Sequence, residues 1–443
     1  MLWYTDKDNN SLYEISIGSE NGSVEANTNG SGMFAYLDNV SSLDLSGLDT
    51  SNMTSMSRMF YNSKSLTNID TSGFDTSKVV NMNGMFWGCN NLKNIDVSNF
   101  KTSKVTDINN MFADCSSLTA LDLSNFDTSN VLYMGNPYNY SYGGMFRNCS
   151  SLVSLNISSF NTSKVKEMSN MFHGCSSLVT LDLSNFDTSN VTAMASMFDS
   201  CTNLKNLNLS SFDTSNVTDM IFMFANCESL TNLNLKNFST SKVTNMSNMF
   251  QNCVSLTNLD LSMFNTSNVT NMGSMFINCT SLIDIDLSSF NTSKVTNMLS
   301  IFEKCKNLKN INLSNFDTSS VTVMKDMFYD CNNLESLDLS MFNTSNVTDM
   351  RGMFWECNNL KSIDVSSFNT SKVTNMRGMF NNCYSLKNIY VSELWNINNV
   401  TSSDRIFYNC KSLTGAVPFD STKIDASMAN YTTEYLTYKK NTN

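Results

Sequence analysis

Histidine and basic residues are scarce in this chain. Its 443 residues include 1 histidine and 28 Lys and Arg against 39 Asp and Glu, a formal net charge of -11 at pH 7. A nucleic-acid-binding surface needs a basic patch to hold phosphates, and none is visible, so we expect no nucleic-acid partner. One histidine, His173, gives no support for a His-based triad or zinc site, and we expect a solvated side chain there.

Long apolar runs and nucleotide-binding or calcium-binding motifs are also missing. No apolar run exceeds a few residues, so no membrane insertion is expected. The first residues, Met1 to Asp6, lack the basic and apolar regions of a signal peptide, so export would depend on a longer parent protein or on another route. There is no P-loop, Rossmann fingerprint or EF-hand loop, and we expect no cofactor.

A 26-residue repeat fills most of the chain. Its best-preserved mark is Met-Phe with Cys three positions later, as in Met249, Phe250 and Cys253, and the Met-Phe position recurs 15 times. Eight extra residues interrupt the period within 135–144. A fixed period of this size is typical of a solenoid, in which each coil buries its apolar face against its neighbours. We predict an N-terminal cap over 1–30, a solenoid over 31–410 and a C-terminal cap over 411–443.

One coil illustrates the expected local structure. Apolar and polar residues alternate from Leu259 to Leu261, which predicts a short strand. The polar run Asn265 to Asn268 predicts a corner. Four later residues have the spacing that places side chains on one helical face: Met272, Met275, Phe276 and Cys279. The sequence therefore predicts an α/β repeat solenoid of about 15 coils, each with a short strand and a short helical or 3-10 segment.

The cysteines share one position of the repeat. All 13 cysteines occupy it, from Cys89 to Cys410, so each stacks on copies of itself. A disulfide framework needs pairs, and a tetrahedral metal site needs four converging ligands, whereas this column offers one thiol per coil. We therefore predict buried free thiols that are unreactive while the fold is intact.

The repeat units resemble a known family. The segments LDLSNFDTSNVTAMASMF (181–198) and CTNLKNLNLSSFDTSNVTDMIFMF (201–224) are similar to the bacterial surface protein 26-residue repeat, a relative of the BspA-like leucine-rich-repeat surface proteins. The resemblance implies a leucine-rich-repeat-like fold and an extracellular or cell-surface location. It also implies adhesion to a host or bacterial surface protein or glycan, and it carries over no catalytic residue. The chain shows neither an export signal nor a wall-anchoring tail.

A column of Asp and Asn residues is expected to line one outward face of the solenoid. Its carboxylates include Asp44, Asp70, Asp96, Asp122, Asp260 and Asp286. A hydrated acidic face is the favoured interpretation, and a calcium-bridged face is the alternative because carboxylate oxygens suit hard cations. Carboxylates about 5 Å apart also occur in retaining glycosidases. This column repeats without a distinct cleft, however, so we predict that the protein is not an enzyme.

The irregular positions are the candidate binding residues. The insertion carries Tyr138, Tyr140 and Tyr142, whose rigid amphipathic rings provide contact area at low entropy cost. The residue after Met-Phe varies between coils and includes Trp87, Tyr329 and Trp355. We predict a non-catalytic binding or adhesion module that recognises a protein or glycan through these positions. The alternatives are an inert structural spacer and a calcium-binding acidic face.

Overall fold

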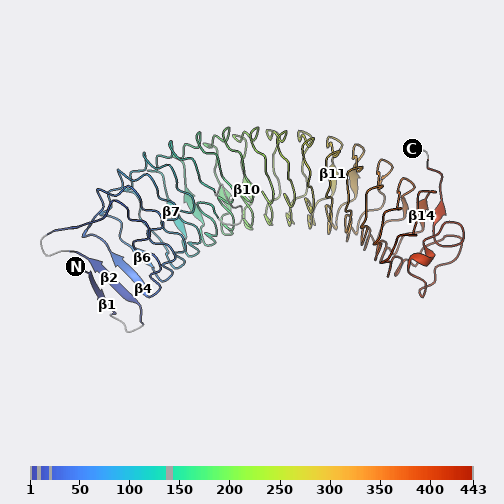
Figure 1. The fold of residues 1–443 in the computed structure, drawn as a ribbon, viewed down its shortest axis with the longest axis horizontal. Coiled ribbons are helices and arrows are strands. Elements are labelled where there is room, and N and C mark those ends of the chain that lie inside the picture. Colours follow the sequence, from blue (N-terminus) through green and yellow to red (C-terminus); the bar gives the residue numbers. More distant parts are fainter. Residues whose placement is uncertain (1, 7–10, 19–21, 136–142, 442–443) are drawn as a thin grey trace. The chain divides into compact units, whose positions relative to one another are not determined.

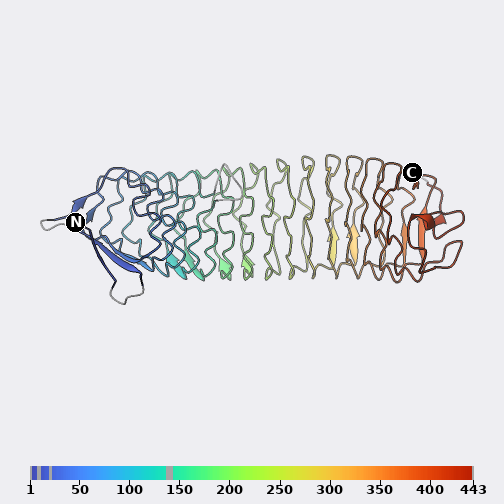
Figure 2. The ribbon, with the colours of Figure 1, turned by 60° about the horizontal axis from the view of Figure 1, so that its bottom comes forward.

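The computed structural model describes residues 2–6, 11–18, 22–135 and 143–441 (Figure 1). The chain forms two compact units, unit 1 (Met1–Val217) and unit 2 (Thr218–Asn443). Within each unit successive coils lie side by side, and the short strands of neighbouring coils line up along one side (Figure 2). These strands fix the positions of the outward-pointing side chains of each coil.

Unit 1 begins with an antiparallel hairpin and continues with parallel pairs. Its strands are β1 (Leu2–Thr5), β2 (Tyr13–Ile17), β3 (Val24–Glu25), β4 (Val40–Asp44), β5 (Leu48–Asp49), β6 (Asn68–Ile69), β7 (Ala120–Asp122), β8 (Ser154–Asn156), β9 (Thr180–Leu181) and β10 (Asn206–Leu207). One sheet has the order β1-β2-β4-β6, with β1 and β2 antiparallel and the other pairs parallel. The remaining strands form the parallel pairs β3-β5, β7-β8 and β9-β10.

Unit 2 contains only parallel pairs among its strands. They are β11 (Asp284–Asp286), β12 (Asn310–Asn312), β13 (Ser362–Asp364), β14 (Asn388–Val391) and β15 (Thr437–Tyr438). β11 pairs with β12, and the second sheet has the order β13-β14-β15. The 3-10 helix η1 (Ala426–Met428) is the only helix in the described ranges, and it is far too short to cross a membrane. At the C-terminal end, Tyr435 packs edge-on against Phe407 at 5.5 Å between ring centroids.

The repeat period sets the register. Ile285 pairs with Ile311, a separation of 26 residues, so equivalent residues of adjacent coils are neighbours. Leu121 pairs with Leu155, a separation of 34 residues, which is one period plus the eight inserted residues. A second column of single-residue parallel bridges, such as Asn271 to Asn297, joins the coils at a place where the sequence suggested no pairing. Where both features occur, adjacent coils are held together at two sites.

The predicted helical segment in each coil is wrong. Between Met272 and Cys279 the backbone forms consecutive turns, and its N–H groups alternate between two kinds of acceptor. Met275 N–H donates to the Met272 carbonyl (3.2 Å) within the coil, whereas Phe276 N–H donates to the Ile301 carbonyl (2.9 Å) of the next coil. An α-helix uses all its N–H groups internally, so these bonds between coils exclude it. The protein is a β-solenoid of about 14 turns rather than an α/β solenoid.

Left-handed residues produce these turns. Ser274 (φ 56°) and Asn278 (φ 60°) lie four residues apart, and both N–H groups donate to the next coil. Equivalent positions in most other coils hold Asn, Asp, Ser or Gly, which tolerate positive φ at low cost. Two successive four-residue turns place side chains inward with the same spacing as a helix. The inward placement of the Met, Phe and Cys residues is accordingly confirmed although the helix is not.

Identical residues stack through the core of each unit. In unit 2 the Phe276 and Phe302 rings lie 5.5 Å apart between centroids and nearly parallel, and Phe264 stacks on Phe290 at 6.5 Å. All of these rings are buried. Because a substitution would interrupt a continuous column, the interior positions are committed to packing.

The cysteines are free and buried, as predicted. Each thiol also has a partner that the sequence did not suggest: Cys279 Sγ lies 3.1 Å from the Phe250 carbonyl oxygen of the preceding coil and donates to it. Ser63 occupies the same position in an early coil, and its hydroxyl donates to the Phe34 carbonyl (2.7 Å). Burial raises the pKa of Cys305 to about 12, which disfavours the reactive thiolate.

Candidate functional site

The residue that follows Met-Phe occupies the same place in each coil. We call these positions the variable column; its members include Tyr61, Trp87, Arg147, His173, Ile277, Tyr329, Trp355 and Tyr408. Trp355 illustrates the geometry. Its N–H donates to the Gly352 carbonyl (3.0 Å), and its carbonyl accepts from Asp330 N–H (2.7 Å) of the preceding coil. The backbone is therefore fixed on both sides, and only the side chain differs from coil to coil.

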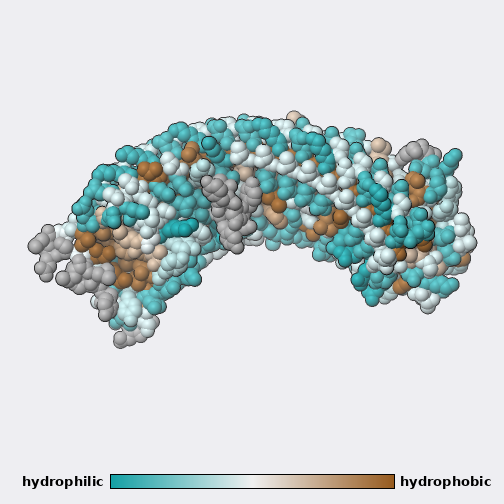
Figure 3. All heavy atoms as spheres, in the orientation of Figure 1, coloured by the Kyte–Doolittle hydropathy of each residue, from teal (hydrophilic) through white to brown (hydrophobic). Residues whose placement is uncertain are grey.

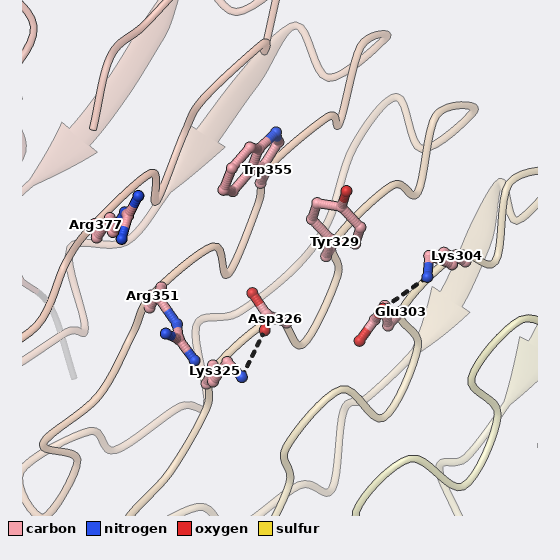
Figure 4. A pocket seen from close by; sticks show the side chains of 8 residues that line it. All are labelled: Glu303, Lys304, Lys325, Asp326, Tyr329, Arg351, Trp355 and Arg377. Atoms are coloured by element: carbon pink, nitrogen blue, oxygen red, sulfur yellow. Dashed lines mark ion pairs between the residues drawn. The ribbon is translucent and has the colours of Figure 1, made fainter. Parts of the chain in front are cut away.

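Unit 2 has a pocket on this column. It encloses about 370 Å³, within the range of about 300 to 1,000 Å³ that small-molecule sites occupy. Its lining consists of the aromatic residues Tyr329 and Trp355, the basic residues Lys304, Lys325, Arg351 and Arg377, and the acidic residues Glu303 and Asp326 (Figure 4). We call it the Trp355 pocket. The visible surface of unit 2 is otherwise mostly hydrophilic, with separate apolar spots (Figure 3).

Two aromatic side chains from adjacent coils form one wall. The Tyr329 and Trp355 rings meet edge to face, with centroids 5.6 Å apart and planes 81° apart. Gly378 (φ 61°) makes room for the indole, because a Cβ there would lie only 3.0 Å from Trp355 Cε3. The indole Nε1 is shielded from solvent and has no hydrogen-bond partner within the described part of the chain. The pocket thus presents rigid rings, and the indole N–H of one of them is buried without an internal partner.

Three of the four basic residues of the pocket come from one repeat position. Lys325, Arg351 and Arg377 each lie two residues before Met-Phe in three consecutive coils, and we call them the basic stripe. Backbone bonds place these coils in register: Asp326 N–H donates to the Arg351 carbonyl (2.8 Å), and Gly352 N–H to the Arg377 carbonyl (2.9 Å). Like charges at the spacing of adjacent coils repel one another.

Ion pairs neutralise most of these charges. Lys325 Nζ lies 3.3 Å from Asp326 Oδ2, and Arg377 Nε lies 3.1 Å from Asp404 Oδ2. Lys304 pairs with Glu303 at 3.3 Å. Arg351 forms no ion pair with any residue that the structure describes, although Figure 4 shows it projecting toward the Lys325–Asp326 pair. The middle residue of the basic stripe therefore lacks the close carboxylate partner that the two outer residues have.

The acidic groups create a second, opposite electrostatic feature. Burial raises the pKa of Asp326, and the charges of Lys325 and Arg351 partly oppose this rise. Burial also raises the pKa of Tyr329, and four nearby carboxylates, beginning with Glu356, add to the effect. Tyr329 therefore keeps its hydroxyl proton as a hydrogen-bond donor at neutral pH. The pocket offers acceptors near Tyr329 and a cationic donor at Arg351.

Unit 1 has an aromatic row at the same repeat positions, but its polar groups are already used. Tyr61 contacts both Tyr36 and Trp87, with ring centroids 5.3 and 5.0 Å apart. The Arg58 guanidinium lies over the Tyr61 and Trp87 rings, 5.7 and 5.8 Å from their centroids. Trp87 Nε1 donates to Asp114 Oδ2 (2.8 Å). Trp87 is thus a satisfied counterpart of Trp355.

The remaining candidate residues are not among those named as the lining of the Trp355 pocket. Tyr138, Tyr140 and Tyr142 lie outside the described residues. His173 is part-buried rather than fully solvated, and its Nδ1 lies 3.2 Å from Asp199 Oδ2 in the next coil.

The acidic column closes a turn in each coil. Asp286 Oδ1 accepts from Ser288 N–H (2.9 Å), and Asn312 makes the same bond with Ser314 (3.2 Å) in the next coil. Both Asp and Asn have the side-chain oxygen that this local bond requires. The bond therefore explains why the column contains only these two residue types along most of its length. No group of three or more His, Cys, Asp or Glu in the described segments is arranged to hold a metal ion. Calcium binding by this face stays a hypothesis.

The fold and the variable column define a repeat protein of the leucine-rich-repeat type. The chain belongs to the family described as "Mycoplasma protein of unknown function, DUF285", whose profile matches residues 28–142, 140–258, 230–337 and 329–442. The name of this family differs from that of the BspA-like repeats, which the sequence resembles. No curated protein matches the chain.

Solved structures similar to this one include bacterial leucine-rich-repeat proteins. A leucine-rich repeat protein from Bacteroides ovatus has a TM-score of 0.51 and 17% identity, over 90% of this chain and 95% of that one. A leucine rich cell surface protein from Faecalibacterium prausnitzii has a TM-score of 0.37 and 16% identity, over 88% and 94%. At such identities the likeness concerns the fold alone.

Proposed function

We propose that this chain is a non-catalytic recognition module of a bacterial cell-surface or secreted protein and binds a protein or glycan through the variable column. The Trp355 pocket is the observation that carries the proposal. It combines an aromatic wall and an arginine without an ion pair on a scaffold whose interior is fully used for packing. Surface groups that make no internal bond are the ones available to a ligand.

The rest of each coil is poorly suited to recognition. The core columns must repeat to stay packed, and the acidic column is nearly uniform because it closes a turn. Specificity requires positions that differ between one surface patch and another. Only the variable column, the neighbouring basic stripe and the insertion meet this requirement. The surface location follows from the resemblance of the repeat units to bacterial surface protein repeats.

A screen of the purified chain against glycan and protein arrays tests the proposal. Three variants then locate the site on any partner found: Trp355→Ala, the combined change of Tyr138, Tyr140 and Tyr142 to Ser, and the combined change of Asp260 and Asp286 to Asn. We expect weaker binding for the first two variants and unchanged binding for the third, all with unchanged melting temperatures.

The same screen separates the proposal from its alternatives. Absence of any partner across both arrays would support the inert spacer instead. Loss of binding in the Asp260 and Asp286 variant alone, together with a calcium requirement, would move the site to the acidic face. Labelling of intact cells with an antibody against the chain tests its location, and signal only after lysis would exclude the surface assignment.

A further inference from the structure

We propose that the Trp355 pocket binds an acidic saccharide, a sugar ring that carries a carboxylate, and that Arg351 is the residue that binds this carboxylate. The inference rests on the proposed recognition function and assigns its ligand class. It follows from three properties of the pocket: a cation without a partner, an aromatic wall and free acceptor oxygens.

The basic stripe points to an anion of one charge. Three cations in register repel one another, and Asp326 and Asp404 compensate only the two outer ones. Arg351 lines the pocket and forms no ion pair among the described residues, and only the longer-range attraction of Asp326 opposes its charge. A guanidinium presents parallel N–H donors that match the two oxygens of a carboxylate, and this bidentate bond is stronger and more directional than a neutral one.

The aromatic wall indicates a ligand with an apolar face. Tyr329 and Trp355 stand at 81° to each other, so a flat ring that lies on one of them contacts the edge of the other. Aromatic faces carry partial negative charge and attract the weakly positive C–H groups of an aliphatic ring. A sugar ring supplies these C–H groups and hydroxyls at the same time.

The remaining acceptors favour hydroxyl groups over a second negative charge. Glu303 uses Oε1 in its ion pair with Lys304, and Asp326 uses Oδ2 in its pair with Lys325, so each keeps another oxygen. Sugar hydroxyls can donate to these oxygens. An acidic peptide or a phosphate ester would instead bring further negative charge toward them, and such repulsion disfavours binding.

Small glycosides provide a direct test with the whole chain. The probes are the methyl glycosides of glucuronic acid and of N-acetylneuraminic acid, with methyl glucoside as the neutral control and glucose 6-phosphate and an acidic hexapeptide as the competing chemistries. Affinities are measured by calorimetry and saturation-transfer NMR. We expect at least one acidic glycoside to bind about 10-fold or more tighter than methyl glucoside, since a charged partner is worth about this factor. The two acidic probes distinguish a uronic from a sialic source.

Variants assign the roles of individual residues. Arg351→Met should reduce the preference for the acidic over the neutral glycoside to about onefold, and Arg351→Lys should restore part of it because it keeps the charge without the fork. Trp355→Ala should abolish binding of both sugars. Met263→Ala is the control, because it removes an exposed apolar side chain of unit 2 outside the variable column and the basic stripe, and it should leave binding of both sugars unchanged. Melting curves check that each variant is folded.

The outcomes separate this inference from the proposed function. Equal binding of acidic and neutral glycosides, or an unchanged preference in Arg351→Met, overturns the acidic-saccharide assignment even if the arrays show another partner. Tighter binding of the phosphate ester or the peptide overturns it as well. Absence of every array partner and of every glycoside would overturn the recognition function itself.

Discussion

Thr318→Val should destabilise the protein strongly although it hardly changes the shape of the side chain. Thr318 is 0% exposed, and its hydroxyl joins two coils. Its Oγ1 donates to the Asn343 carbonyl (2.9 Å) and accepts from the N–H of the same residue (2.8 Å). Valine can make neither bond. Both backbone groups of Asn343 would lose the partner that the buried Thr318 side chain provides.

The expected loss follows from the number of groups affected. A buried polar group that loses its partner costs about 1 to 3 kcal/mol, and two groups are affected here. The methyl group that replaces the hydroxyl returns about 1 kcal/mol through burial of apolar surface. The free energy of unfolding should therefore fall by about 1 to 5 kcal/mol.

Urea unfolding followed by circular dichroism measures this change. Thr318→Ser keeps the hydroxyl and loses only a methyl group, so it should cost about 1 kcal/mol. Thr322→Val is the exposed control: its hydroxyl makes one 3.3 Å bond to the Thr296 carbonyl, and the change should cost far less. A Val variant as stable as the parent, or more stable than Thr318→Ser, would show that apolar packing and not the hydroxyl holds the coils at this position.

Three further predictions concern backbone strain, thiol reactivity and acid stability. Phe222 has φ 54° where most other coils hold Asn, Asp, Ser or Gly, so Phe222→Gly should raise the free energy of unfolding by about 1 kcal/mol; a lower melting temperature would mean that the ring contributes more than the strain costs. Native protein should react with a small thiol reagent only as fast as it unfolds, because the cysteines are buried and their pKa values are raised, and rapid labelling of several thiols without denaturant would contradict this. Hydrogen bonds from Ser262 and Ser288 lower the pKa values of Asp260 and Asp286 from 3.8, so their contribution to stability is present above that value and is lost as the pH falls through the lower folded-state value. The Asp260→Asn and Asp286→Asn double variant keeps the acceptors and should lose less stability between pH of about 5 and about 2.5 than the parent, as judged by melting temperatures.

The register and the core could be predicted from the sequence because they follow from the period alone. Residues 26 apart become neighbours in any in-register solenoid, so burial of Phe276 or Cys279 in one coil implies burial of its equivalents. The helix could not be predicted correctly from apolar spacing, since two successive four-residue turns give the same spacing. The distinguishing signal lies at Ser274 and Asn278, where residues that tolerate positive φ recur four apart. Such residues both weaken a helix and permit the turns.

The pocket could be predicted only in part. Tyr329 and Trp355 were recognisable because aromatic residues interrupt an otherwise mixed column. Arg351 could not be predicted from its own position, because its role depends on the residues that lie beside it in the adjacent coils. Its signal is the basic stripe itself, three consecutive cations at a position that holds Gly273 and Leu299 in the preceding coils. The ion pairs that leave Arg351 alone depend on side-chain geometry and needed the structure.

A solenoid separates folding from recognition more completely than a globular domain does. Each interior position must match its copies in the adjacent coils, so the core allows little variation along the chain. Each outward position is free of this restriction, and a new combination of residues from neighbouring coils costs little stability. The Trp87 and Trp355 positions illustrate the consequence: the same residue at the same repeat position is internally satisfied by Asp114 in one place and left with an unused donor beside an unpaired arginine in the other. The proposed recognition function therefore depends on which residues adjacent coils bring together.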